Sequence, residues 1–158
     1  MRRLIHLAKR FSETLWSHPL GPAEQAETSM WLGERESALF WAQPPIDQRH
    51  ALAAARIVAS HGPHRRDLIR AALLHDIGKR HSRLGVPGRV TAATLELLHI
   101  PAPGRLGVYL RHDLLGAEEL GELGVEPIVV SFAAGHHGTC PPDVDPDDWA
   151  LLARADGE

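Results

Sequence analysis

The sequence has little of what would place it in several common protein classes. It contains one cysteine, Cys140, which excludes an intramolecular disulfide and fits a reducing compartment. No stretch reaches the roughly 18 uninterrupted apolar residues that a membrane span needs. The first ten residues are basic but lack a long apolar region and a cleavage site of small residues, so they are a poor signal peptide. We therefore expect a cytoplasmic protein without a membrane partner.

Strong charge and repetition are also missing. The formal net charge of −3 argues against strong, electrostatically driven binding of nucleic acid. We find no internal repeat and no low-complexity tract. The chain has 158 residues, of which 44% are hydrophobic and 23% charged. These values are ordinary for one globular unit with a core of its own.

Signals for β-strands are weak, and apolar residues recur at helical spacing between proline and glycine breaks. The pattern therefore predicts an all-α fold. Asp47 suits the N-cap of one helix, and Gly78 suits the C-cap of the next. We expect helices over residues 4–15, 23–42, 47–61, 67–77, 91–98, 110–123, 126–134 and 147–155.

What the sequence does contain is a His–Asp doublet, His75-Asp76, inside an otherwise apolar helical run. Neighbouring residues on a helix point about 100° apart, so the two side chains cannot share one buried face. Burying either group without a partner is unfavourable by several kcal/mol. A metal ion would accept both the imidazole nitrogen and the carboxylate oxygen. The alternative is a doublet on a helix surface, which the apolar flank disfavours.

Further candidate ligands follow in order along the chain. His112 lies in a segment where Gly116 and Ala117 would let a neighbouring helix approach closely, and the adjacent Asp113 is interpreted either as solvated or as a residue that supports a metal ligand. The histidines of a second doublet stand between glycines, where two solvated imidazoles at a helix end are the alternative. Six of the 11 histidines fall outside the pattern, so histidine abundance alone is not an argument. The candidate metal ligands are His50, His75, Asp76, His112, His136, His137 and Asp156.

From His50 to Asp156 the chain resembles the HD-domain metal-dependent phosphohydrolases, in particular an HDIG-type, dinuclear branch related to HD-GYP proteins. The Gly-Tyr-Pro signature of HD-GYP proteins is missing. The resemblance implies a helical bundle of about six to eight helices over residues 46–158. Residues 1–45 would then be a helical extension that either caps the core or forms a homodimer surface.

The resemblance also implies a division of the ligands between two metal ions. One ion would be held by His50, His75, Asp76 and Asp156, and the other by Asp76, His112, His136 and His137. Lys79 would face a substrate phosphate, and Asp76 and Lys79 would be the catalytic residues. Iron and manganese are the favoured metals, while nickel, cobalt and zinc are also compatible with a shell of histidines and carboxylates.

The implied activity is hydrolysis of a phosphate ester or nucleotide, including phosphodiesters, by a water activated between two metals. The partner would be a small phosphorylated or nucleotide substrate. Two alternatives stay open. One is a degenerate HD module that binds a nucleotide and signals without turnover. The other is a mixed-valent di-iron HD oxygenase. Such oxygenases tend to have a single histidine at the position of His136-His137, so the doublet in this chain favours hydrolysis.

Overall fold

A computed structural model describes residues 18–157, and within that range every regular element is a helix. The predicted all-α class is confirmed. The helix predicted over residues 4–15 lies outside the described residues. None of the described helices is long and apolar enough to cross a membrane. The elements are α2 (Pro22–Trp31), α3 (Glu34–Trp41), α4 (Pro45–His61), α5 (Arg66–Leu74), the 3₁₀ helix η1 (Ile77–Ser82), α6 (Val86–Leu97), α7 (Gly104–Tyr109), α8 (His112–Leu123), α9 (Pro127–Gly135) and α10 (Pro146–Asp156).

Helix α5 lies at the centre of the bundle. Six of its residues are buried, including Leu68, Ile69, Leu73 and Leu74. Its neighbours are α4, α9 and α10, while α8 packs against both α9 and η1. Phe132 of α9 is fully buried in the same core. Because α5 is enclosed in this way, the residues at its carboxyl end are delivered into the interior of the molecule.

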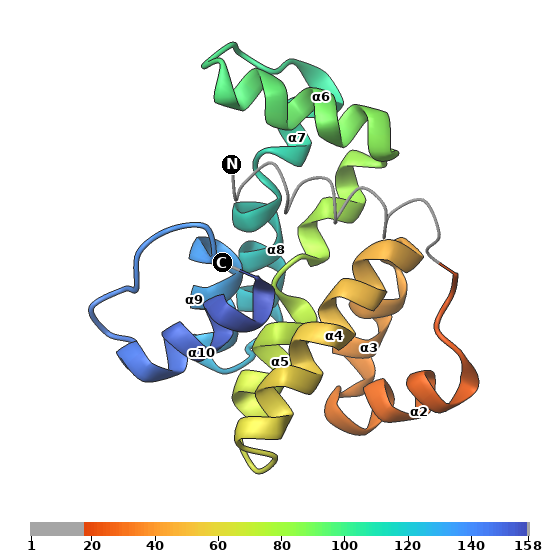
Figure 1. Cartoon of the computed structure of the whole chain (residues 1–158), viewed down its shortest axis with the longest axis vertical. Helices are drawn as coiled ribbons and strands as arrows, with labels where there is room; N and C mark the ends of the chain where they lie inside the picture. The colour runs from red at the N-terminus through yellow and green to blue at the C-terminus, as the bar shows by residue number, and fades with distance from the viewer. Residues whose placement is uncertain (1–17, 158) are drawn as a thin grey trace.

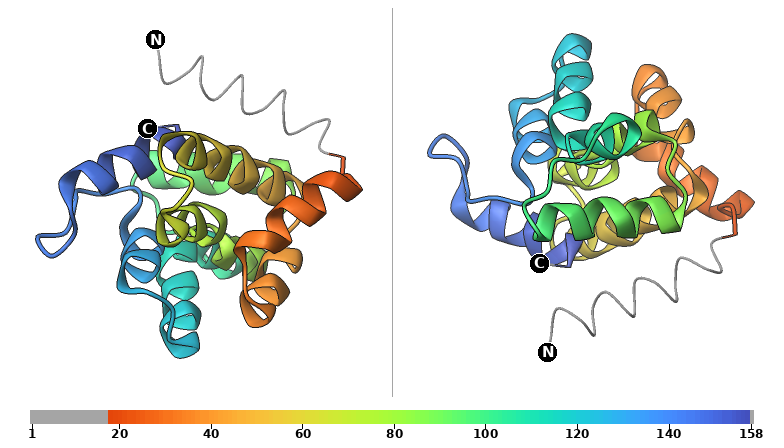
Figure 2. Two further views of the ribbon diagram at one scale, coloured as in Figure 1. Left: turned by 90° about the horizontal axis from the view of Figure 1, so that it is seen from below. Right: turned by 90° about the horizontal axis from the view of Figure 1, so that it is seen from above.

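The remaining helices surround the central helix α5 (Figure 1). Helices α2 and α3 lie on one side, next to α4 and α5, and α10 lies on the opposite side. Helices α6 and α7 form one end of the molecule, and seen from above α6 crosses that end (Figure 2). The division of the chain at residues 45 and 46 stays a prediction.

One helix predicted over residues 23–42 is wrong, because the chain turns between α2 and α3. Leu32 and Gly33 are extended. The Gly33 amide donates to the Glu36 carboxylate over 2.8 Å, which caps the start of α3. The break adds one helix to residues 18–45. From α4 onward the described range holds seven α-helices and η1, within the six to eight expected over residues 46–158.

The predicted end of the central helix is also wrong. Helix α5 stops at Leu74, and the chain continues as the 3₁₀ helix η1 rather than as an α-helix to Ile77. Gly78 is not a C-cap. A Cβ atom at Gly78 would lie 1.9 Å from the carbonyl oxygen of His112, so the glycine permits η1 to touch the start of α8. The expected close approach at Gly116 is confirmed, since its Cβ would lie 3.1 Å from the Gly78 nitrogen.

Asp47 was predicted as the N-cap of the helix that carries His50. Instead α4 begins at Pro45, in the first position that suits proline, and Asp47 lies within its first turn. The Asp47 carboxylate is buried and binds Arg89. The cap prediction is wrong because the helix begins two residues before Asp47, whose side chain binds Arg89 instead.

Candidate metal centre

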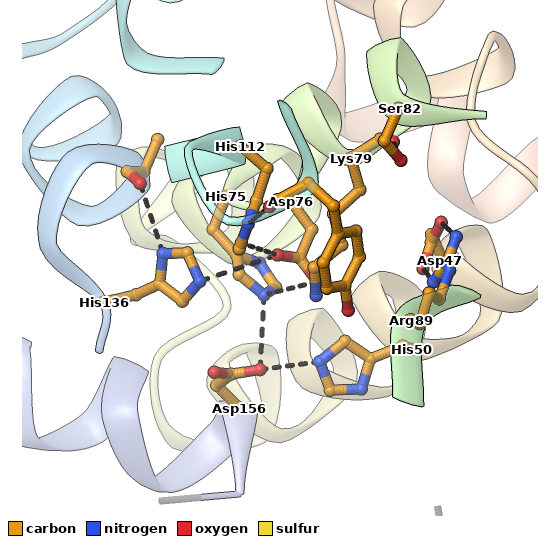
Figure 3. Close-up of polar contacts among 12 residues, drawn as sticks. Asp47, His50, His75, Asp76, Lys79, Ser82, Arg89, His112, His136 and Asp156 are labelled. Carbon is orange, nitrogen blue, oxygen red and sulfur yellow. Dashed lines mark hydrogen bonds and ion pairs between the residues drawn. The ribbon is translucent and has the colours of Figure 1, made fainter. Parts of the chain in front are cut away.

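The predicted ligands come from five separate places in the fold and meet in one cluster (Figure 3). His50 lies on α4, and the His75-Asp76 doublet fills the junction between α5 and η1. His112 is the first residue of α8, the His136-His137 doublet follows α9, and Asp156 is the last residue of α10. Most of these positions are helix ends, where the backbone can change direction.

The break after α5 explains how both members of the first doublet reach the cluster. His75 still has helical backbone angles, whereas Asp76 has φ −101° and ψ 5°. The 100° divergence expected on a continuous helix therefore does not apply. Both side chains are almost wholly buried. The prediction that both residues belong to an unbroken helix is wrong. Their side chains nevertheless point into the same cluster, where both could bind one metal ion.

Asp76 lies at the centre of the cluster. Its Oδ1 atom is 3.3 Å from Nε2 of His112 and 3.5 Å from Nε2 of His136. Its Oδ2 atom is 3.4 Å from Nε2 of His75. The two carboxylate oxygens thus face different histidines, which is the arrangement that a carboxylate shared between two cations requires.

Asp156 joins the cluster from the opposite side. Its Oδ1 atom lies 2.6 Å from Nε2 of His50 and 3.2 Å from Nε2 of His75. Asp156 is buried although it is the last residue of α10. Its position near the end of the chain therefore does not place it in solvent.

Backbone carbonyls fix the orientation of three of the imidazole rings. The Nδ1 atoms of His75, His112 and His136 lie 3.0, 2.7 and 3.2 Å from the carbonyl oxygens of Ala72, Tyr109 and Ala133. A carbonyl oxygen only accepts, so each Nδ1 must carry the donated proton. In the neutral ring, Nε2 is then left with a lone pair that faces the carboxylates, as in metal-bound histidines.

Four buried atoms in the cluster have no hydrogen-bond partner among residues 18–157: Nε2 of His75, His112 and His136, and Oδ1 of Asp76. Buried polar atoms are almost always paired, and when the rings are neutral these four atoms are all acceptors. Acceptors at 3.3–3.5 Å repel unless a cation lies near them. Histidine nitrogens with carboxylate oxygens suit a divalent transition metal. The residues present therefore fit the metals that the sequence implied.

Three groups of ligand atoms lie within 4.8 Å of one another: His112 with His136 and His137, His50 with His75 and Asp76, and His75 with His136 and Asp156. The first two groups fall within the two predicted ligand sets. The third group links those sets. His137 is exposed, whereas His136 beside it is buried. How the ligands divide between ions stays a prediction.

The carboxylates determine the charge of the metal-free cluster. Burial alone would lower the pKa of His75, but the charges of Asp76 and Asp156 outweigh it and raise that pKa to about 10. Burial, followed by the charge of His75, lowers the pKa of His136 to about 3. Despite burial, neighbouring Lys79 and His75 hold the pKa of Asp76 well below its usual range. The metal-free protein therefore keeps a proton on His75 at neutral pH.

We expect metal binding to displace this proton. Titration of Mn²⁺ into chelator-treated protein should release about one proton per chain at pH 8.5, where a histidine of ordinary pKa, about 6.5, is already neutral. Apparent metal affinity should fall as pH falls, by about tenfold per unit, because the proton competes for the same nitrogen. Calorimetry in buffers of different ionisation enthalpy counts the protons. Release of none at pH 8.5 would contradict a protonated His75.

Lys79 was predicted to face substrate, and here it contacts the metal ligand. Its Nζ atom lies 2.5 Å from Oδ2 of Asp76. The side chain is only 14% exposed. Burial would lower the pKa of Lys79, but the Asp76 charge outweighs it and raises that pKa. Its role toward substrate stays a prediction.

Sequence reasoning missed a second ion pair beside the centre. Both guanidinium Nη atoms of Arg89 bind the Asp47 carboxylate, each over 2.6 Å. The Arg89 guanidinium lies 5.7 Å from the centre of the Tyr109 ring, and Tyr109 in turn accepts the hydrogen bond from His112. This pair joins α6 to α4 on the Lys79 side of the cluster (Figure 3). No local signal could reveal it, because the two residues are 42 positions apart.

The remaining histidines of the described range, His18, His61, His64, His81 and His99, belong to none of these ligand groups. His81 pairs with Glu119 over 2.7 Å. His6 lies outside the described residues. The assignment of the other five histidines as metal ligands stays a prediction.

The chain matches the family model "Cas3, HD domain" over residues 15–156. The match supports the HD superfamily expected from the motifs, but it does not confirm the branch related to HD-GYP. No curated protein and no solved structure matches the chain.

Proposed function

Because the chain belongs to the Cas3 HD-domain family within the HD superfamily, whose members are typically metal-dependent hydrolases, we propose that it cleaves phosphodiester bonds. The HD domain of Cas3 is a nuclease, which favours a diester over a monoester as the substrate. Because the formal net charge of the chain is −3, we expect its surface outside the site to bind a nucleic-acid strand only weakly.

The observation that carries this proposal is the set of four buried, unpartnered atoms around Asp76. A structural cluster of histidines would satisfy its nitrogens with protein donors, because unpaired buried groups destabilise the fold. Here three backbone carbonyls instead hold the rings so that their Nε2 atoms point inward, toward the carboxylates. Such an arrangement is expected of a set of side chains that binds metal ions.

We propose that His50, His75, Asp76 and Asp156 hold one divalent ion and that Asp76, His112, His136 and His137 hold the other. When bound, two such ions supply Lewis acidity toward phosphoryl oxygens and lower the pKa of water. The protein's contribution is positional. The carbonyls of Ala72, Tyr109 and Ala133 orient the rings, and buried Asp76 keeps the two ligand sets at a short, fixed separation.

The test combines metal content with hydrolysis. Protein purified without chelator should contain about two transition metal ions per chain, with iron or manganese favoured. It should cleave bis(p-nitrophenyl) phosphate and a DNA oligonucleotide faster than p-nitrophenyl phosphate. Prolonged EDTA treatment should abolish turnover, and Mn²⁺ should restore it.

His112→Ala should lose about one of the two ions and most of the turnover, because it removes a ligand from one side of Asp76 only. His64→Ala is the matched control, since His64 is exposed and outside every ligand group. One ion in the unaltered protein would point to a mononuclear centre. Iron with O₂ consumption would replace the hydrolase by an oxygenase. Full metal loading with nucleotide binding but no turnover would favour a signalling module.

A further inference from the structure

A cavity of about 370 Å³ lies beside the metal centre and is lined by cations. Four of its lining residues are Lys79, Arg80, Arg83 and Arg89, and the rest are neutral, among them Gln43. None of the described residues that line it is acidic. Lys79 is the link to the metal centre, because it lines this cavity and also binds Asp76.

Two of these cations are held rigidly by acids from outside the cavity lining. Arg80 binds Glu119 over 2.5 Å and the carbonyl oxygen of Ile77 over 2.7 Å. Arg89 is clamped by Asp47 and also donates to the carbonyl oxygen of Leu84. Glu119 and Asp47 offset the charges of these two guanidinium groups, so the groups contribute fixed N–H donors rather than net charge, and little side-chain freedom is lost when an anion arrives.

The other two cations differ in how available they are. Arg83 forms no ion pair with any described residue and is exposed. Lys79 is neutralised by Oδ2 of Asp76, the oxygen that also faces His75. In the metal-free protein, the charge of Lys79 is therefore directed to the metal centre and away from the cavity.

Asp76 cannot serve Lys79 and two metal ions fully at the same time. Its Oδ1 atom faces His112 and His136, so its Oδ2 atom is the oxygen left for the ion on the His75 side. A divalent ion there would compete with the ammonium group for Oδ2, and like charges would repel Lys79 from the centre. The cavity that Lys79 already lines is the adjacent space able to receive its charge.

We propose that this cavity binds a phosphate group of the substrate, next to the phosphate that is cleaved, and that metal binding switches it on by releasing Lys79 from Asp76. The proposal rests on the proposed phosphodiesterase function for its substrate class. Its consequence is a reciprocal coupling: metal strengthens phosphate binding in the cavity, and phosphate there strengthens metal binding by the same factor.

The switch can be tested without any metal. Asp76→Asn keeps the shape of the side chain but removes the charge that holds Lys79. In metal-free protein, titrated with inorganic phosphate by calorimetry, we expect this variant to bind about tenfold more tightly than the unaltered protein. Adding Arg83→Gln or Lys79→Gln to Asp76→Asn should remove the gain. Adding Arg35→Gln, an exposed arginine at a different surface, should leave it.

A second measurement does not depend on the Asp76 variant being folded. In Lys79→Gln the competitor for Oδ2 is gone, so Mn²⁺ should bind about tenfold more tightly than to the unaltered protein, again by calorimetry. Arg35→Gln should leave Mn²⁺ affinity unchanged. Equal or weaker Mn²⁺ binding by Lys79→Gln would overturn the release of Lys79. A phosphate affinity indifferent to Arg83→Gln would overturn the cavity as the binding site.

These outcomes are separate from those of the proposed function. If the unaltered protein loads metal and cleaves diesters while phosphate and Mn²⁺ titrations show no effect of Lys79, only the coupled cavity fails. If the protein shows no diester cleavage although Asp76→Asn gains phosphate affinity through Arg83, the cavity stands and the hydrolase proposal fails.

Discussion

Replacing Asp76 by alanine is expected to leave the protein without bound transition metal and to lower diester hydrolysis by about a thousandfold or more. The reason is the position of the carboxylate. Its two oxygens lie 3.3–3.5 Å from Nε2 atoms of three different histidines, so it is common to both predicted ligand sets. Loss of any single histidine leaves one set intact, whereas loss of Asp76 damages both.

Elemental analysis of the purified variant and a turnover assay with bis(p-nitrophenyl) phosphate check this expectation. The matched control is Asp113→Ala, because Asp113 is the acid of the other His–Asp doublet and, within the described part of the chain, accepts a hydrogen bond only from the amide of Leu114. That variant should keep both metal and turnover. Removing Asp76 also leaves Lys79 without its partner, so circular dichroism must show that the variant is folded. Two ions retained in a folded variant would contradict the proposed bridging role.

The membership of the cluster could be predicted from sequence because ligand chemistry restricts the residue types. His75-Asp76 in an apolar run and a second histidine doublet between glycines are unusual local patterns, whereas His50 and Asp156 were predicted chiefly from their positions in the HD-domain pattern. The structure brings these residues together with His112. Helical periodicity also predicted most elements, since the buried faces of α4, α5, α8 and α9 repeat at helical spacing.

What could not be predicted depends on contacts between distant segments. The end of α5 at Leu74 is one case: η1 is held by its contact with α8, and nothing local marks the change of helix type. The pairing of Arg89 with Asp47, 42 positions away, is another. Lys79 and Asp76 are only three positions apart, so their pairing is local rather than long-range. The break before α3 is different. Gly33 followed by Glu36 is a recognisable helix start, so that boundary could have been predicted.

Gly78→Ala is expected to have the second largest effect, and it acts through the backbone. A Cβ atom there would lie 1.9 Å from the His112 carbonyl oxygen and 2.8 Å from the Gly116 nitrogen. Neither is the flexible end of a side chain, so η1 and α8 must separate. Overpacking of this kind should lower the free energy of unfolding by about 3 kcal/mol and Tm by about 10 °C. Because α8 begins at His112, the same movement should weaken metal binding on that side of Asp76.

Two glycines of α8, on the other side of this contact, provide a graded comparison with Gly78. At Gly116 a Cβ would meet the Gly78 nitrogen at 3.1 Å, a milder conflict, whereas at Gly121 it would meet nothing within 4 Å. Gly121→Ala should therefore raise the free energy of unfolding by about 0.5–1 kcal/mol, the usual gain from replacing glycine inside a helix. Thermal unfolding of the three metal-free variants should rank them Gly121→Ala, Gly116→Ala, Gly78→Ala from most to least stable. A Gly78→Ala protein as stable as Gly121→Ala would show that η1 does not touch α8 as described. That result would also contradict the placement of His112 opposite Asp76, because His112 begins α8.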